Sequence, residues 1–102
     1  MNVKVEIFRN RFVISGNGKY KEFLANPEFT STRLLIGNFQ AAEYCLKNGL
    51  EALGIKKSIL SGKPVLHFYP REMIEGGLSE VENRILLEVG FAVGAKKVEI
   101  HV

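Results

Sequence analysis

The stretch "YPREMIEGGLSEVENR", Tyr69 to Arg84, decides the fold because it joins an apolar run to a helical pattern through two glycines. Ser79 and Glu82 match the S-x-x-E capping box, in which the serine hydroxyl accepts from the Glu82 N–H and the carboxylate reaches back. Glycine-rich turns before helices often bind phosphate, because free helix N–H groups and the helix dipole favour anions. A phosphate here would meet like charge from four carboxylates: Glu72, Glu75, Glu80 and Glu82. The stretch therefore predicts a self-capped helix start and not an anion site.

Apolar patterns on both sides of this stretch extend the prediction. The run Pro64–Tyr69 is apolar almost throughout, which is typical of a central strand covered on both faces. After Ser79, apolar residues recur at helical spacing until Gly94, and Lys96–Val102 then alternates as a final strand. Upstream, Asn38 is a candidate N-cap for another helix that stops at Gly54 and carries one apolar face: Phe39, Ala42, Leu46, Leu50 and Leu53.

The first quarter of the chain predicts an antiparallel meander of three strands. Val3, Val5 and Ile7 alternate with charged residues, and Phe12–Ile14 and Tyr20–Leu24 supply two further strand patterns. "SGNG", Ser15 to Gly18, is a strong turn signal between the second and third strands. The segment Ala25–Thr32 reads as a linker broken by Pro27.

The predicted element order is β-β-β-α-β-α-β, in one α/β domain that spans residues 1–102. Right-handed crossovers place the last two strands parallel to the first, with helices packed on the sheet. This order matches the ribonuclease-H-like unit, which is also the building block of actin-like proteins. By analogy with that unit we expect a mixed five-stranded sheet in the order 3-2-1-4-5.

Two segments resemble the MreB family of bacterial actins. The family pattern of a strand, a proline, a variable loop and "VERRA…AGAREV" is matched by Pro70, Val81–Arg84 and Val93–Val98. The family's "DFxxAExxL" helix is matched by Asn38-Phe39 and Ala42-Glu43…Leu46. The resemblance covers Arg33 to Val102, about two-thirds of the chain, and implies the fold of one actin subdomain.

The chain departs from the MreB pattern at the residues that hold nucleotide. The family's first phosphate loop, "DxGT", is replaced by Phe8-Arg9-Asn10-Arg11, which has neither an acidic residue nor a glycine. The second loop, "DIGGGT", lies beyond Val102. The resemblance therefore implies the fold and argues against ATPase activity, and we expect no enzyme activity and no cofactor.

Metal and nucleophile chemistry find little support in the sequence. A ribonuclease-H-type nuclease needs converging carboxylates on two metal ions, but Glu6 and Glu99 each alternate with apolar residues and read as solvated strand charges. His67 and His101 form a poor metal site without an organised acidic partner. Cys45 lies in a helical apolar pattern and reads as a buried hydrophobe. We expect no catalytic residue and no metal site.

Bulk composition is that of a globular protein, with 46% hydrophobic and 25% charged residues and a net charge of +3. One cysteine excludes an intrachain disulfide. No signal peptide or membrane span is apparent, so the expectation is a cytoplasmic protein.

The favoured function is a non-enzymatic protein-interaction module, associated with cell-shape, envelope or assembly machinery or with itself. The final strand should form an exposed sheet edge that pairs with a second copy: Val98, Glu99, Ile100, His101 and Val102. One alternative is nucleic-acid binding through basic residues of the meander: Arg9, Arg11, Lys19 and Lys21. Another is residual nucleotide binding between Arg9–Arg11 and the second glycine turn.

Overall fold

The computed structural model describes residues 1–16, 18–55 and 62–102. Its elements are β1 (Asn2–Phe8), β2 (Arg11–Gly16), β3 (Lys19–Leu24), α1 (Phe39–Ala52), β4 (Val65–Pro70), α2 (Glu80–Ala92) and β5 (Lys97–Ile100). The predicted element order is confirmed. Asn17 of the predicted turn and residues 56–61, part of the basic stretch "KKSILSGK" before β4, lie outside the described residues.

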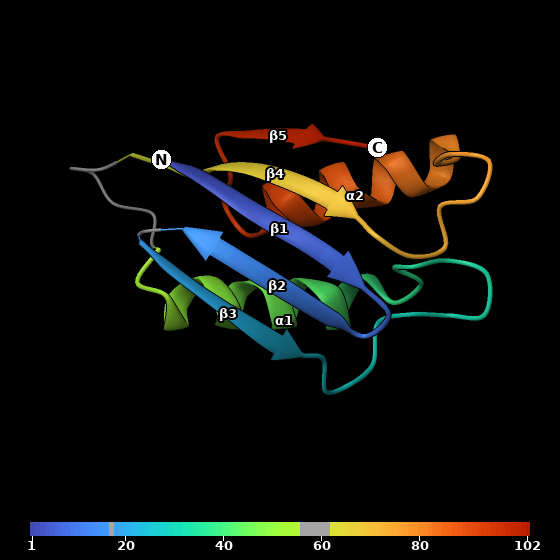
Figure 1. Ribbon diagram of the computed structural model, residues 1–102, viewed down its shortest axis with the longest axis horizontal. Coiled ribbons are helices and arrows are strands. Elements are labelled where there is room, and N and C mark those ends of the chain that lie inside the picture. The colour runs from blue at the N-terminus through green and yellow to red at the C-terminus, as the bar shows by residue number, and fades with distance from the viewer. Residues whose placement is uncertain (17, 56–61) are drawn as a thin grey trace.

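The five strands form one mixed sheet in the order β3-β2-β1-β4-β5 (Figure 1), as predicted. β1 pairs with β2, and β2 with β3, in antiparallel register, whereas β1–β4 and β4–β5 are parallel. Both helical connections, β3 to β4 and β4 to β5, move in the same direction across the sheet. Because such crossovers are right-handed, both helices cover the same face, and they lie behind the strands in Figure 1.

The prediction that β4 is covered on both faces is wrong. Leu66, Phe68 and Pro70 are buried toward the helices, but His67 and Tyr69 point to the opposite side and are only half-buried. The second face, which we call the open face, has no helix over it among the described residues. The continuous apolar run arises because β4 lies between two parallel strands, so even its outward residues are flanked by neighbours.

Two helical glycines let the helices lie close to the sheet. A Cβ at Gly49 of α1 would lie 2.5 Å from the Ile14 side chain of β2, and one at Gly90 of α2 would lie 2.5 Å from Val98 of β5. Because protein cores are packed without spare volume, only hydrogen at these positions permits the observed approach.

The segment predicted as a linker contributes to the core. Phe29 is fully buried and stacks on Phe12 of β2, with ring centroids 4.7 Å apart. Its carbonyl oxygen accepts hydrogen bonds from the N–H groups of Gly37 and Asn38, at 2.7 and 2.9 Å. The loop before α1 is therefore fixed to the sheet by an aromatic anchor.

The last strand is shorter than the predicted Lys96–Val102. β5 ends at Ile100, so His101 and Val102 lie beyond it, although the His101 N–H still donates to the Phe68 carbonyl at 2.9 Å. Backbone groups of alternate β4 residues face β5, so after Phe68 the next residue to face it is Pro70. Proline has no N–H to donate to β5. The ladder therefore stops there.

Candidate functional site

The glycine turn before α2 is the self-capped helix start that the sequence predicts. Gly76 and Gly77 have φ of 79° and 85°, a region that favours glycine. The Ser79 hydroxyl accepts from the Glu82 N–H at 3.2 Å, and the Glu82 carboxylate accepts from the Ser79 N–H at 3.1 Å. A carboxylate of the chain thus already occupies the positive end of the helix dipole.

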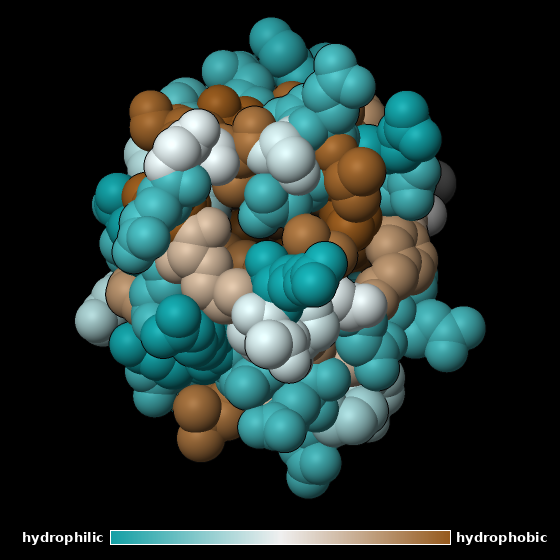
Figure 2. All heavy atoms as spheres, turned by 90° about the vertical axis from the view of Figure 1, so that its right-hand side faces the viewer, coloured by the Kyte–Doolittle hydropathy of each residue, from teal (hydrophilic) through white to brown (hydrophobic). Residues whose placement is uncertain are grey.

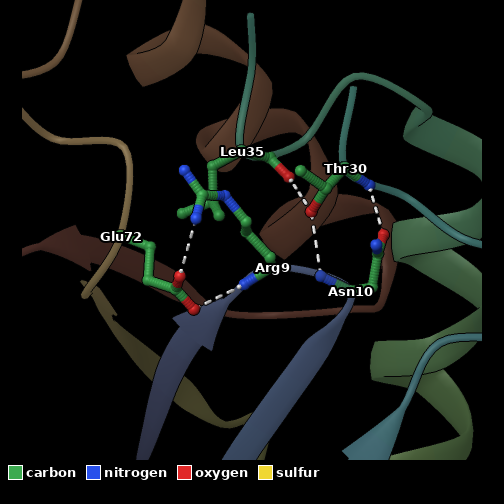
Figure 3. Close-up of polar contacts among 5 residues, drawn as sticks. All are labelled: Arg9, Asn10, Thr30, Leu35 and Glu72. Carbon is green, nitrogen blue, oxygen red and sulfur yellow. Dashed lines mark hydrogen bonds and ion pairs between the residues drawn. The ribbon is translucent and has the colours of Figure 1, made fainter. Parts of the chain in front are cut away.

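The β1–β2 turn, where the resemblance would place a phosphate loop, is also satisfied within the chain (Figure 3). The Glu72 carboxylate accepts from the Arg9 N–H at 3.0 Å and lies 3.4 Å from its guanidinium. The Asn10 N–H donates to the Thr30 hydroxyl at 2.9 Å, and this hydroxyl donates to the Leu35 carbonyl at 2.7 Å. The N–H groups of this turn therefore already donate to a carboxylate and a hydroxyl of the chain, so they are not available to an anionic ligand.

The end of the sheet that carries this turn offers little room for a ligand. Figure 2 faces this end and shows apolar side chains interspersed among hydrophilic ones. A depression there, lined by Leu35, Pro70 and Leu78 among others, encloses about 10 Å³. That volume is the size needed for one water molecule. This depression is therefore too small for a nucleotide.

The structure does not bring the four basic residues of the meander together. Arg11 pairs with Leu24 and Lys19 with Gly16, so the two cations lie at opposite ends of the hairpin, roughly 17 Å apart at strand spacing. Arg9 and Arg11 are ion-paired with Glu72 and Glu22, and the Lys21 amine lies over the Phe23 ring. The arrangement is two separate pairs and not one phosphate-binding stripe.

Both outer strands of the sheet have an unpaired side among the described residues. β5 was the predicted edge, and it is four residues long with a Lys97–Glu99 ion pair at 3.5 Å. β3 is six residues long, and its Tyr20 and Leu24 side chains are each 74% exposed. The more accessible edge is therefore β3, which the sequence did not single out.

A cluster of metal-binding side chain types lies on the open face beside β5. The β4–β5 register sets His67 opposite Glu99, and one ligand atom from each of His67, Glu99 and His101 lies within 4.8 Å of the others. The sequence prediction assumed that the histidines have no acidic partner, and this assumption is wrong. Alternation along a strand puts Glu99 and His101 on the same face. Their approach to His67 depends on the pairing register of β4 with β5, which the sequence alone does not reveal.

The other chemically interesting side chains are engaged elsewhere. Glu6 accepts from the Arg71 guanidinium at 2.9 Å and is not in the histidine cluster. Cys45 is buried, its thiol lies 3.7 Å from the Phe23 carbonyl oxygen, and burial raises its pKa to about 11. Such a thiol is a poor nucleophile because the thiolate is the reactive form.

Comparison with known structures defines the fold class as actin-like. The chain superposes on MreB5 of Spiroplasma citri, solved bound to ADP, with a TM-score of 0.70 and 12% sequence identity. The superposition covers 98% of this chain but only 37% of MreB5. At this identity the likeness concerns the fold alone.

Sequence comparison gives the particular family. The chain is 35% identical over 89 residues to the uncharacterized protein YjaA of Escherichia coli (strain K12), which covers 83% of this chain and 70% of YjaA. The chain therefore belongs to the YjaA family. No family model matches it. Neither described helix is long and apolar enough to cross a membrane.

Proposed function

We propose that this protein is a non-enzymatic association module that pairs with a second copy of itself through an open edge of its sheet. The single observation that carries the proposal is the exposure of β3, whose two large apolar side chains, Tyr20 and Leu24, lie in solvent at an unpaired edge. Long exposed edges with apolar side chains are templates for strand pairing. We also propose a role in cell-shape, envelope or assembly machinery, which the MreB resemblance implies.

The backbone of β3 has hydrogen-bonding groups available for a partner strand. The Ala25 N–H donates to the Asn10 carbonyl oxygen at 2.8 Å. Because antiparallel pairs alternate, Phe23 and Lys21 also face β2, whereas the N–H groups of Leu24, Glu22 and Tyr20 point outward. Three consecutive outward positions are enough for a regular ladder with another strand.

The side chains of β3 suit self-pairing in one register. A two-fold axis through Glu22 places Tyr20 of each copy opposite Leu24 of the other, all on the open face. The two Glu22 carboxylates then approach one another, and each is already paired with its own Arg11 guanidinium. The result is a continuous ten-stranded sheet with all helices on one side, which is a closed isologous dimer.

The β5 edge remains the alternative that the sequence favours. Since the His101 N–H faces β4, the Ile100 N–H faces outward. Short length and charged side chains both protect an edge. Both strands carry charged residues, so length separates them, and β5 is the shorter at four residues against six. The geometry therefore supports β3 over β5, and one experiment can separate them.

The test is the dependence of molar mass on protein concentration, measured by sedimentation or light scattering, for a matched pair of variants. Glu22→Pro removes the N–H at the proposed axis, and Glu22→Thr keeps it while also losing the Arg11 ion pair. Glu22→Pro should raise the dimer dissociation constant about 10- to 100-fold, since two backbone bonds are lost per dimer at roughly 1 kcal/mol each. Glu22→Thr should dimerise at least as well as the unaltered chain, because the repulsion between two carboxylates disappears.

A second matched pair tests β5. Ile100→Pro removes the outward N–H, and Ile100→Ala keeps it with a similar loss of packing. If Ile100→Pro dissociates the dimer and Glu22→Pro does not, the pairing edge is β5 and the β3 register is wrong. A chain that stays monomeric at several hundred micromolar refutes association through either edge.

Nucleic-acid and nucleotide binding receive less support. The basic residues are separated, Arg9 and Arg11 are ion-paired, and the Arg9–Asn10 turn is occupied by Glu72 and Thr30. Absence of enzyme activity and a cytoplasmic location stay predictions from the sequence.

A further inference from the structure

Two histidines and one glutamate from neighbouring strands converge on the open face. His67 lies on β4, Glu99 lies opposite it on β5, and His101 follows two residues later on the same side. The His67 Nδ1 and His101 Nε2 atoms are 3.0 Å apart, and the three ligand atoms all lie within 4.8 Å of one another. All three residues are half-buried, so they are held in place yet accessible.

Neighbouring side chains fix the orientation of both imidazole rings. Asn2 Oδ1 lies 3.0 Å from His67 Nε2 and accepts its proton, which leaves Nδ1 with a lone pair directed into the cluster. The Tyr69 ring stacks on His101 with centroids 4.6 Å apart and planes 10° from parallel. A histidine whose second nitrogen donates to an oxygen is the usual arrangement around bound metal ions.

We propose that His67, Glu99 and His101 bind a divalent transition-metal ion, with Zn²⁺ as the reference metal. The ligands are His67 Nδ1, His101 Nε2 and a Glu99 carboxylate oxygen. This inference is independent of the edge pairing proposed above, since it concerns the open face of a single chain.

The nitrogen pair needs only a small adjustment to accept the ion, whereas the Glu99 carboxylate must rotate closer, since the three ligand atoms now lie within 4.8 Å of one another. At Zn–N distances of about 2.0–2.1 Å, two nitrogens of a tetrahedral site stand roughly 3.3–3.4 Å apart. The observed separation of 3.0 Å is therefore a few tenths of an ångström short. With the proton of His67 on Nε2, facing Asn2, His101 Nε2–H donates to His67 Nδ1 in the metal-free cluster. To bind the ion, neutral His101 takes its other tautomer, with the proton on Nδ1, so that the Nε2 lone pair faces the ion. Three protein ligands leave a fourth position for water.

The charges around the cluster favour an imidazole-binding metal over a hard cation. The Lys97 amine lies 3.5 Å from Glu99 Oε2, but its side chain is 66% exposed and free to turn into solvent. The Lys4 amine and the Arg71 guanidinium lie over the Tyr69 ring, and Arg71 is neutralised by Glu6. With one carboxylate among these cations, Mg²⁺ and Ca²⁺ have too few oxygen ligands, whereas Zn²⁺, Cu²⁺ and Ni²⁺ accept two imidazoles.

The experiment is calorimetric titration of the full chain, without an added histidine tag, with Zn²⁺ and separately with Mg²⁺. We expect one Zn²⁺ ion per chain and no Mg²⁺ binding. His67→Gln, His101→Gln and Glu99→Gln should each weaken Zn²⁺ binding by roughly 100-fold or more, because loss of an outer-shell partner alone costs about 10- to 100-fold. Asn2→Ala, which removes such an outer-shell partner, should fall within that smaller range.

The matched control is Glu6→Gln, a carboxylate on the same face that pairs with Arg71 and lies outside the cluster, so this variant should weaken Zn²⁺ binding far less than Glu99→Gln does. Circular dichroism of each variant confirms that it folds, and the imidazole nitrogen resonances should shift at His67 Nδ1 and His101 Nε2 when Zn²⁺ is added. The proposal is overturned if the unaltered chain binds no Zn²⁺ at millimolar concentration. It is equally overturned if the two histidine variants bind as tightly as the unaltered chain, or if Glu6→Gln weakens binding as much as Glu99→Gln does.

Discussion

Replacing Thr30 with valine should destabilise the protein substantially, although the two side chains have nearly the same shape. The Thr30 hydroxyl accepts from the Asn10 N–H at 2.9 Å and donates to the Leu35 carbonyl at 2.7 Å, and both contacts are partly buried (Figure 3). Valine leaves this donor and this acceptor without their partner. Each lost hydrogen bond costs about 1 kcal/mol, and more where water cannot reach the abandoned group.

The expected loss is therefore about 2–3 kcal/mol in the free energy of unfolding. For a domain of this size, 1 kcal/mol corresponds to a shift of about 4–8 °C in Tm, so Thr30→Val should lower Tm by roughly 10–20 °C. Urea unfolding followed by circular dichroism measures the free energy, and a thermal scan measures Tm.

Two control variants separate the hydroxyl from other effects. Thr30→Ser keeps the hydroxyl and should lose much less stability than Thr30→Val. Thr32→Val makes the same exchange at an exposed position of the same loop and should change stability by no more than about 0.5 kcal/mol. If Thr30→Val is within 0.5 kcal/mol of the unaltered chain, the turn is not held by these hydrogen bonds and the reasoning is refuted.

Two further predictions concern the helices. Ser79→Ala should lower the free energy of unfolding by about 1 kcal/mol, because it removes the hydroxyl that caps α2. Ser79→Asp keeps a capping oxygen and should retain most of that stability. Equal urea midpoints for the two variants would contradict this. Cys45 should react with a thiol reagent at pH 8 only after unfolding, because burial raises its pKa to about 11. In the unfolded chain the Cys45 thiol has its ordinary pKa of 9.0 and loses its proton before the folded chain does, so stability falls as pH rises from about 9 to 11. A Cys45→Ala variant should lose this part of the alkaline dependence, and an unchanged slope would count against it.

Local features of the fold were predictable because they depend on residues close in sequence. The capping box at Ser79 and the N-cap at Asn38 each depend on a side-chain oxygen that accepts from a backbone N–H three residues later. Both predictions are confirmed. The strand order followed from the handedness of the crossovers and from the analogy with the ribonuclease-H-like unit.

Features that depend on register or distant packing were not predictable from one sequence. Phe29 lies in a segment with loop composition, and only the stacking on Phe12 reveals its place in the core. The cluster at His67 needs the pairing of β4 with β5, because a shift of one residue would put Glu99 on the opposite face. The exposed face of β4 was likewise hidden, since an apolar run does not reveal how many layers cover it.

The one-sided core also has an evolutionary consequence. Residues that must stay apolar for folding, such as Val5, Ile14 and Phe68, point mostly to the helices, while the alternate positions on the same strands are largely polar or exposed, with Val13 as a buried exception. Selection for folding and selection for binding therefore act on different halves of each strand. New surface chemistry can therefore arise on the open face of this sheet by single substitutions, because most of them leave the core under the helices intact.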